Sequence, residues 1–224
     1  MSSPTPPSPA AATPVSLTER RKAATRMDIA RAAAQLFVKH GLRATRAEDI
    51  AQAAGIAPRT FYRYFATKEE SVAPLYAAGA QLWAEAVRQA PAGLSVPQAL
   101  EHAVRHTLMP GAGVSAASWE WVRTLIRLAE ASPSLRKVWA EVCQAGERTL
   151  AEVLAERLTP GDDNVAGPLP ARTDLRFAAA VASDAVRTAV EAWATGDAPA
   201  SGPAGLALRN LGALGEFPWE GRRG

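Results

Sequence analysis

TRAEDIAQAAGIAPRTFYRYFATK, residues 45–68, has the pattern of two short helices on either side of a glycine turn. Thr45 is a favourable N-cap for the first helix, and Glu48 three residues later completes a capping box. Gly55 is expected to end that helix, because glycine adopts the left-handed conformation at the least cost. Pro58 then falls in the first turn of the second helix, where a proline is tolerated. The stretch therefore predicts a helix-turn-helix.

The second helix, expected over residues 58–64, differs between its two faces. Phe61 lies one turn before Phe65, so the two rings share a face and are predicted to pack inward. Arg59 and Thr60 project elsewhere. A basic helix after a glycine turn is the arrangement that enters a DNA major groove. A generic helical hairpin with a solvated basic face is the simpler alternative.

Helices are also predicted on both sides of this stretch. One spans about residues 18–40, carries apolar residues at helical spacing and ends before Gly41. Another begins after Thr67, for which Glu70 is the capping-box partner. Lys68 lies at the start of this helix, where a lysine is a natural contact for a DNA phosphate.

The region contains three motifs: IARAAAQLFVKHGLRAT (29–45), DIAQAAGIAPRTFYRYF (49–65) and TKEE (67–70). These motifs resemble the TetR family of bacterial transcriptional regulators, and the resemblance extends over about residues 21–72. The rest of the chain fits that family in length and helical pattern only. The resemblance implies that a double-stranded DNA operator is a partner and that the helix at 58–64 enters its major groove.

The resemblance also implies a set of residues that contact the DNA. These are Thr45, Arg46, Arg59, Thr60, Tyr62, Arg63, Tyr64 and Lys68. In this scheme Thr45 and Lys68 contact phosphates at the edges of the groove, and Arg59 and Thr60 face bases.

Two positions depart from the family's usual pattern. Ala57 stands where Ser or Thr is usual, so the second helix lacks a side-chain N-cap, a loss of about 1 kcal/mol that Pro58 offsets in part. Arg46 stands where a small hydroxyl residue is usual. It could contact DNA or pair instead with Glu48 or Asp49.

The composition limits the class of protein. With 224 residues and 48% hydrophobic side chains, the chain can form one medium domain or two small ones. The single Cys143 excludes an internal disulfide framework and suits a reducing compartment. The sequence shows neither an apolar run of transmembrane length nor a signal-peptide pattern. We therefore expect a cytoplasmic protein without a membrane partner.

The charge is unevenly distributed along the chain. The formal net charge is only +3, but residues 1–66 hold ten Lys or Arg against four Asp or Glu. The remaining residues are mildly acidic, with fifteen against eighteen. The basic excess thus accompanies the helix-turn-helix, as electrostatic attraction to DNA requires. Residues 20–22 are basic and form either an arm for the minor groove or a solvated helix start.

The chain is predicted to be all-α, with a three-helix DNA-binding domain at residues 18–66 and a helical ligand-binding and dimerisation domain at 67–224. Residues 1–17 are rich in proline and are expected to be disordered. Residues 159–172 have the composition of a loop. Further helices are predicted at about 96–108, 118–130, 133–158, 173–195 and 203–214.

The resemblance implies that the last two predicted helices pair with their copies in a homodimer. The residues proposed for this contact are Leu175, Ala182, Val186, Val190, Leu211 and Leu214. Their spacing gives each helix one apolar side. The alternative is that both helices only cover the protomer's own core.

The helical domain is also expected to bind a small molecule. The proposed ligand-binding residues are Trp119, Arg123, Trp139 and Phe177, because ligand pockets combine large apolar side chains with a few polar groups. Some of these aromatic residues could instead belong to the ordinary core. The sequence does not indicate the identity of the effector.

No pattern of catalytic or cofactor-binding residues stands out. His102 and His106 share a helix face, but a metal site needs a third ligand and the sequence shows none nearby. The sequence contains no glycine-rich phosphate loop and no nucleophile elbow. We therefore predict no catalytic site, no cofactor and no metal.

Together these features predict a homodimeric transcriptional regulator, most simply a repressor, that binds a palindromic operator and is released by a small, largely apolar effector. An architectural DNA-binding protein without an effector would instead have no cavity in its helical domain and little sequence preference. A helical enzyme that merely retains the motif would show turnover and no operator.

Overall fold

A computed structural model of the protein describes residues 16–109, 116–158, 173–196 and 202–219. The helices are α1 (Leu17–His40), α2 (Ala47–Ala53), α3 (Pro58–Tyr64), the 3-10 turn η1 (Glu70–Val72), α4 (Ala73–Gln89), α5 (Val96–Leu108), α6 (Ala116–Ala131), α7 (Pro133–Leu158), α8 (Thr173–Thr195) and α9 (Ala204–Gly212). All regular elements in these residues are helical, which confirms the predicted fold class. The predicted loop at 159–172 and nearly all of the predicted tail lie outside the described residues.

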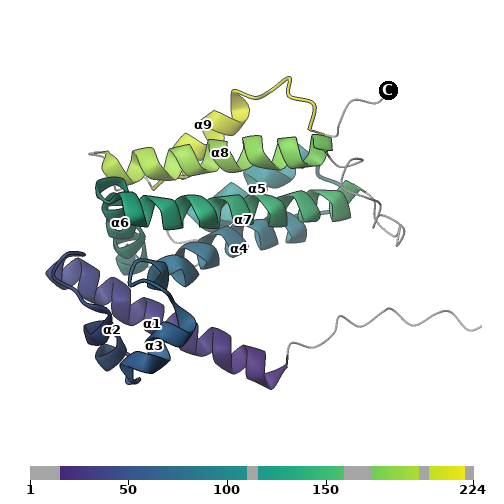
Figure 1. Cartoon of the computed structure of the whole chain (residues 1–224). Helices are drawn as coiled ribbons and strands as arrows, with labels where there is room; N and C mark the ends of the chain where they lie inside the picture. The colour runs from purple at the N-terminus through teal and green to yellow at the C-terminus, as the bar shows by residue number, and fades with distance from the viewer. Residues whose placement is uncertain (1–15, 110–115, 159–172, 197–201, 220–224) are drawn as a thin grey trace, which may run out of the picture.

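The first three helices form a compact unit at one end of the molecule (Figure 1). Its core contains Ile29 from α1, Ile50 from α2, Phe61 from α3 and Phe65, each at most 3% exposed. Gly55 has a φ of +68°, which is the left-handed conformation predicted for the turn between α2 and α3. The expected inward packing of the two phenylalanines is therefore confirmed.

The structure corrects the start of α2. Its N-cap is Arg46 rather than Thr45, and the Asp49 carboxylate accepts a hydrogen bond from the Arg46 backbone N–H at 2.8 Å. The Thr45 hydroxyl donates instead to the carbonyl of Gly41 at 2.9 Å. That carbonyl lies just past the end of α1, where backbone groups lack helical partners, so it competes with α2 for the Thr45 side chain.

The structure also corrects the start of α4. The Thr67 hydroxyl accepts from the Glu70 backbone N–H at 3.2 Å, as predicted, while the Glu70 carboxylate accepts from the backbone N–H of Ala66 at 3.0 Å. Glu70 is the first residue of the short turn η1, and α4 begins only at Ala73. Pro74 therefore lies in the first turn of α4, where it removes no helical hydrogen bond.

The remaining helices pack into a bundle next to this unit (Figure 1). α7 packs against both α4 and α8, and α9 packs against α8 and α5. α4 and α7 approach closely at Gly146, where a Cβ atom would lie 3.1 Å from the Cβ of Ala80. α8 contributes an alanine face to the bundle core, with Ala178, Ala179 and Ala182 fully buried.

The bundle and the three-helix unit share one apolar cluster. Val72 of η1 and Tyr76 of α4 belong to the same cluster as Phe61 of α3, Leu125 of α6 and Leu135 of α7. Because protein interiors are close-packed, a displacement of α4 or α6 disturbs the packing that supports α3. The arrangement thus connects the two parts mechanically.

Candidate functional site

The outward face of α3 groups five of the residues predicted to contact DNA. Arg59, Tyr62 and Arg63 are exposed, while Thr60 and Tyr64 are half-buried. α3 lies at the surface of the three-helix unit, on the side away from the bundle (Figure 1). The helix can therefore enter a groove, and the individual DNA contacts stay predictions.

Arg26 of α1 holds the C-terminal end of α3, a role that the sequence did not indicate. Its guanidinium donates to the carbonyl of Tyr64 at 3.1 Å and lies over the Phe65 ring, 4.6 Å from the ring centroid. This contact satisfies a terminal carbonyl and complements the negative end of the helix dipole. Arg26 and Tyr64 are 38 residues apart, so no local pattern could reveal the pair.

Glu48 of α2 is the partner of two predicted DNA contacts. Arg46 Nε lies 3.5 Å from one Glu48 carboxylate oxygen, and the Tyr62 hydroxyl donates to the other at 3.4 Å. The Arg46 side chain is 76% exposed, so this ion pair is weak. The alternative in which Arg46 pairs with Glu48 is therefore the one seen here, and a DNA phosphate could replace that carboxylate.

Thr45 and Lys68, the two predicted phosphate contacts, are joined within the protein. The Lys68 ammonium donates to the carbonyls of Leu42 and Thr45, both at 2.7 Å. Thr45 is only 2% exposed. Because an ammonium group has three hydrogens, one remains for a phosphate. Lys68 thus ties the chain before η1 to the connection between α1 and α2.

Replacing Lys68 with alanine is expected to have two separable effects. Loss of the two charged hydrogen bonds should lower the free energy of unfolding by about 1–3 kcal/mol in urea denaturation. If Lys68 also contacts a phosphate, DNA affinity should fall for all sequences alike, and the salt dependence of binding should decrease by about one unit of slope. The exposed cation Lys137 of α7 provides a control, since Lys137→Ala should change neither quantity. An unchanged salt slope would show that Lys68 is purely structural.

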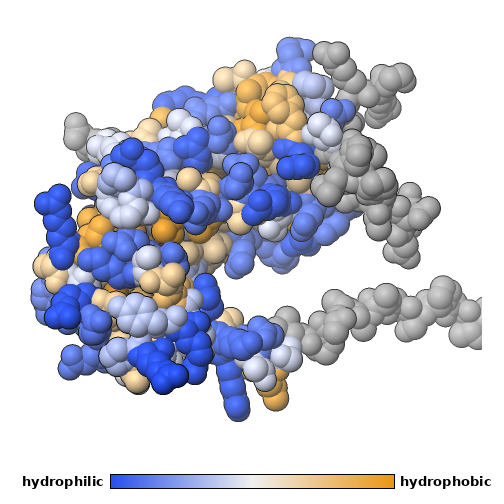
Figure 2. Space-filling view, viewed as in Figure 1, coloured by the Kyte–Doolittle hydropathy of each residue, from blue (hydrophilic) through white to orange (hydrophobic). Residues whose placement is uncertain are grey.

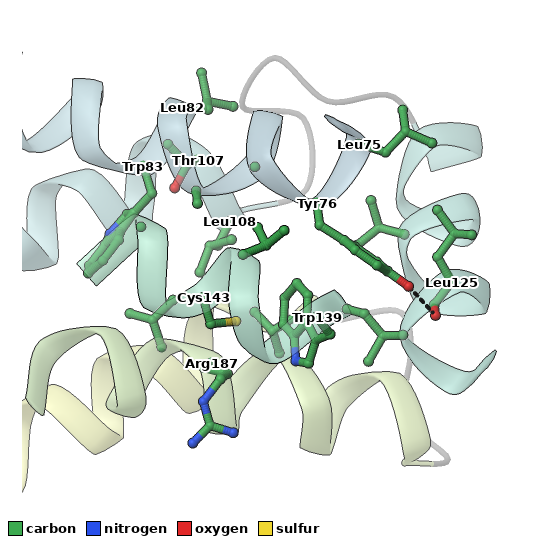
Figure 3. A pocket seen from close by; sticks show the side chains of 18 of the residues that line it. Leu75, Tyr76, Leu82, Trp83, Thr107, Leu108, Leu125, Trp139, Cys143 and Arg187 are labelled. Carbon is green, nitrogen blue, oxygen red and sulfur yellow. Dashed lines mark hydrogen bonds between the residues drawn. The ribbon is translucent and has the colours of Figure 1, made fainter. Parts of the chain in front are cut away.

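A cavity of about 530 Å³ lies where the bundle meets the three-helix unit. α1, α4, α5, α6, α7 and α8 all contribute to its wall. Figure 3 shows labelled side chains of α4, α5, α6, α7 and α8 around it. The lining is mainly apolar and includes Leu75, Leu108, Leu125, Ile126, Val142, Val186 and Val190. A pocket of this size and character suits a drug-sized, largely apolar ligand.

Aromatic side chains make up much of the cavity wall, among them Trp119 and Trp139, two of the predicted ligand-binding residues. Tyr76 meets Trp139 edge-on with ring centroids 5.0 Å apart, and its hydroxyl donates to the carbonyl of Leu125 at 2.9 Å (Figure 3). Burial raises the pKa of Tyr76 above its ordinary value, so the hydroxyl stays protonated. The indole N–H groups of Trp83 and Trp119 are buried and meet no acceptor among the described residues.

The one cation on the α8 side of the cavity, among the described lining residues, is paired with two carboxylates. The Arg187 guanidinium donates to Glu191 at 2.9 and 3.0 Å and to Asp184 at 2.9 and 3.1 Å. Burial lowers the pKa of Arg187, but the hydrogen bonds to these carboxylates raise it more, so the guanidinium stays charged. Glu191 also accepts from the Trp139 indole N–H at 2.7 Å. A ligand acid would have to compete with two carboxylates for this arginine.

Two ionisable groups of α7, the thiol of Cys143 and the carboxyl of Glu147, also line the cavity. Burial raises the pKa of the Cys143 thiol to about 12, so Cys143 is neutral and unreactive near pH 7. Burial also raises the pKa of Glu147, and the nearby Asp184 carboxylate adds to the effect. The α7 side of the cavity therefore offers an anionic ligand no positive charge.

Two predicted ligand-binding residues do not line the cavity. Arg123 is 8% exposed and donates to the carbonyls of Ala194 at 3.2 Å and Gly196 at 2.7 Å, because the end of α8 leaves these groups without helical partners. Phe177 is 61% exposed and packs on Phe217, with ring centroids 5.5 Å apart. Figure 2 shows an apolar patch where α8 begins and the segment after α9 ends.

The predicted dimerisation residues divide between the protomer's core and its periphery. Ala182, Val186 and Leu211 are at most 8% exposed and belong to the bundle core. The other three are half-buried: Leu175, Val190 and Leu214. Three of the six residues are thus buried within the protomer. Pairing of two protomers through the outer faces of α8 and α9 stays a prediction.

The two histidines on α5 stack on each other rather than converge on a third ligand. The rings of His102 and His106 have centroids 5.1 Å apart. Among the described residues no three potential metal ligands cluster. The described helices also include none that is long and apolar enough to cross a bilayer.

Residues 29–72 match the sequence profile of a family described as bacterial regulatory proteins, tetR family. The matched region runs from the middle of α1 through η1. The HTH-type transcriptional regulator TcmR of Streptomyces glaucescens is 31% identical over 143 residues. That alignment covers 63% of this chain and 63% of TcmR.

Solved structures show a similar fold over most of the chain. Thermus thermophilus FadR, described as a TetR-family transcriptional repressor in complex with lauroyl-CoA, is 26% identical with a TM-score of 0.53. The match covers 89% of this chain and 96% of FadR. Salmonella enterica GusR is 20% identical with a TM-score of 0.51, over 87% of this chain and 95% of GusR, and this likeness concerns the fold alone.

Proposed function

We propose that this chain, which belongs to the tetR family of bacterial regulatory proteins, is a ligand-responsive transcriptional repressor. It binds a palindromic operator as a homodimer and places α3 of each protomer in a major groove. The two half-sites lie about one helical turn apart, on the order of 34 Å. Arg59 and Thr60 contact bases, Lys68 contacts a phosphate, and Tyr62 and Tyr64 contact backbone phosphates or thymine methyl groups.

One observation carries this proposal: the exposed basic helix α3 and a cavity of about 530 Å³ belong to the same protomer and are linked through α4. Leu75, Tyr76 and Trp83 of α4 line the cavity, while Tyr76 also belongs to the apolar cluster that contains Phe61. A ligand that binds better to one position of α4 therefore changes the position of α3.

The lining favours a small, largely apolar effector. The complex of Thermus thermophilus FadR with lauroyl-CoA supports this class of ligand, because FadR has a similar fold over most of the chain. The same cavity argues against a purely architectural DNA-binding protein, for which an apolar cavity would serve no purpose. We assign the chain no catalytic function, and as a regulator of bacterial DNA it would act in the cytoplasm.

A mobility-shift assay with the DNA upstream of the protein's own gene tests the proposal. We expect a single retarded band in which two protomers bind one operator. An unrelated duplex should not compete. Ligands found by thermal shift should then release the DNA. Binding without sequence preference and without any stabilising ligand would support the architectural alternative, and substrate turnover without operator binding would support an enzyme.

A further inference from the structure

The cavity reaches the three-helix unit itself. Arg31 and Gln35, both on α1, line it together with residues of the bundle. Both are exposed, and so are Gly79 and Leu82 of α4 and Val122 of α6, which also line it. These five residues therefore form the solvent-side rim. Leu82 and Val122 are 50% and 38% exposed, so part of this rim is apolar.

Positive charge on the cavity wall is confined to two arginines among its described lining residues, Arg31 and Arg187. Arg187 is already held by two carboxylates. Arg31 pairs with Asp28 at 3.3 Å and with no second carboxylate in the part of the chain that the structure describes; the two side chains are 64% and 65% exposed. Such exposed pairs are weak and exchange partners readily. Arg31 is therefore the cation that an anionic ligand can recruit.

We propose that the effector is an elongated amphipathic acid whose anionic head lies on Arg31 at the rim and whose apolar body fills the cavity. This inference rests on the proposed function and specifies its ligand. Glu147 on the α7 side of the lining offers an anion no positive charge, while the aromatic wall accepts an apolar chain. The guanidinium binds a carboxylate or phosphate through charge-assisted hydrogen bonds.

This orientation gives the ligand a direct contact with the DNA-binding unit. Arg31 lies five residues after Arg26 on α1, and Arg26 holds the C-terminal end of α3 through the Tyr64 carbonyl. A head group on Arg31 therefore acts on the helix that supports α3, in addition to any effect through α4. The coupling requires that the acid bind the DNA-bound and DNA-free positions of α1 unequally.

Three probes with the same ten-carbon chain test the inference: decanoate, 1-decanol and decylammonium. Each is titrated below its micelle concentration into the DNA-free full-length protein, and tryptophan fluorescence reports binding because Trp83, Trp119 and Trp139 line the cavity. Decanoate should bind roughly three- to tenfold more tightly than 1-decanol. Arg31→Ala should abolish this preference, Arg31→Lys should restore part of it, and the exposed control Lys137→Ala should leave it intact.

The inference is overturned if 1-decanol or decylammonium binds the wild-type protein as tightly as decanoate does, if the preference survives in Arg31→Ala, or if none of the three probes binds. These titrations contain no DNA. Failure of operator binding in the mobility-shift assay would instead count against the proposed function, so the two failures are distinguishable.

Discussion

The double variant Arg59→Ala/Thr60→Ala is expected to lose sequence-specific binding to the operator. Each base contact contributes about 1–3 kcal/mol, and a homodimer loses both contacts in both half-sites, so the affinity should fall by about a hundredfold or more. Arg59 is exposed and Thr60 is half-buried on the outer face of α3. The free energy of unfolding should therefore change by only about 0.5 kcal/mol.

Fluorescence anisotropy with the operator and with a scrambled duplex measures this effect. Weak, salt-dependent binding to both duplexes should persist, because other cations of the basic unit still attract phosphates. The control Lys137→Ala removes one exposed cation from α7 and should retain full operator preference. Retention of base preference by the double variant would show that α3 is not the recognition helix.

Phe61→Ala is expected to lower the free energy of unfolding by about 3–5 kcal/mol. The Phe61 ring is 0% exposed, lies 5.9 Å from the Phe65 ring and belongs to the cluster that joins α3 to Val72 and Tyr76. The vacated space cannot collapse without moving α3, so operator binding should be lost as well. Urea denaturation followed by circular dichroism measures the change.

The same substitution at an exposed phenylalanine provides the matched control. Phe177 is 61% exposed on α8 and touches Phe217, so Phe177→Ala should cost at most about 1 kcal/mol. If the two variants were equally stable, the described packing of α3 would be wrong.

Most helix boundaries followed from the sequence because their signals are local. Caps, prolines and apolar spacing predicted α3, α5, α7 and α8 at the residues where the structure has them. The starts of α2 and α4 were wrong, since Thr45 bonds to the end of α1 and η1 intervenes after Thr67. In both places a short-range signal competed with a neighbouring element.

The cavity was only partly predictable. Residue size and position on a helix favoured Trp119 and Trp139, and both line it. The same reasoning selected Phe177, which lies outside the lining, because an aromatic residue on a helix gives no indication of which neighbour it faces. Arg123 lies outside the lining for a related reason, since the carbonyl of Ala194 to which it donates lies 71 residues further along the chain. Tyr76 was missed because its place in the wall depends on α6 and α7.

The sequence by itself determined an all-α chain with a basic helix-turn-helix, because helix caps, a left-handed glycine and the spacing of Phe61 and Phe65 act within a few residues. Only the tertiary structure decided which helix faces meet. It placed Arg26 on the end of α3, tied Lys68 to the connection before α2, and brought Arg31 of α1 to the rim of the cavity. Periodicity specifies which side of a helix is buried, but the partner of that side depends on close packing between segments far apart in the chain.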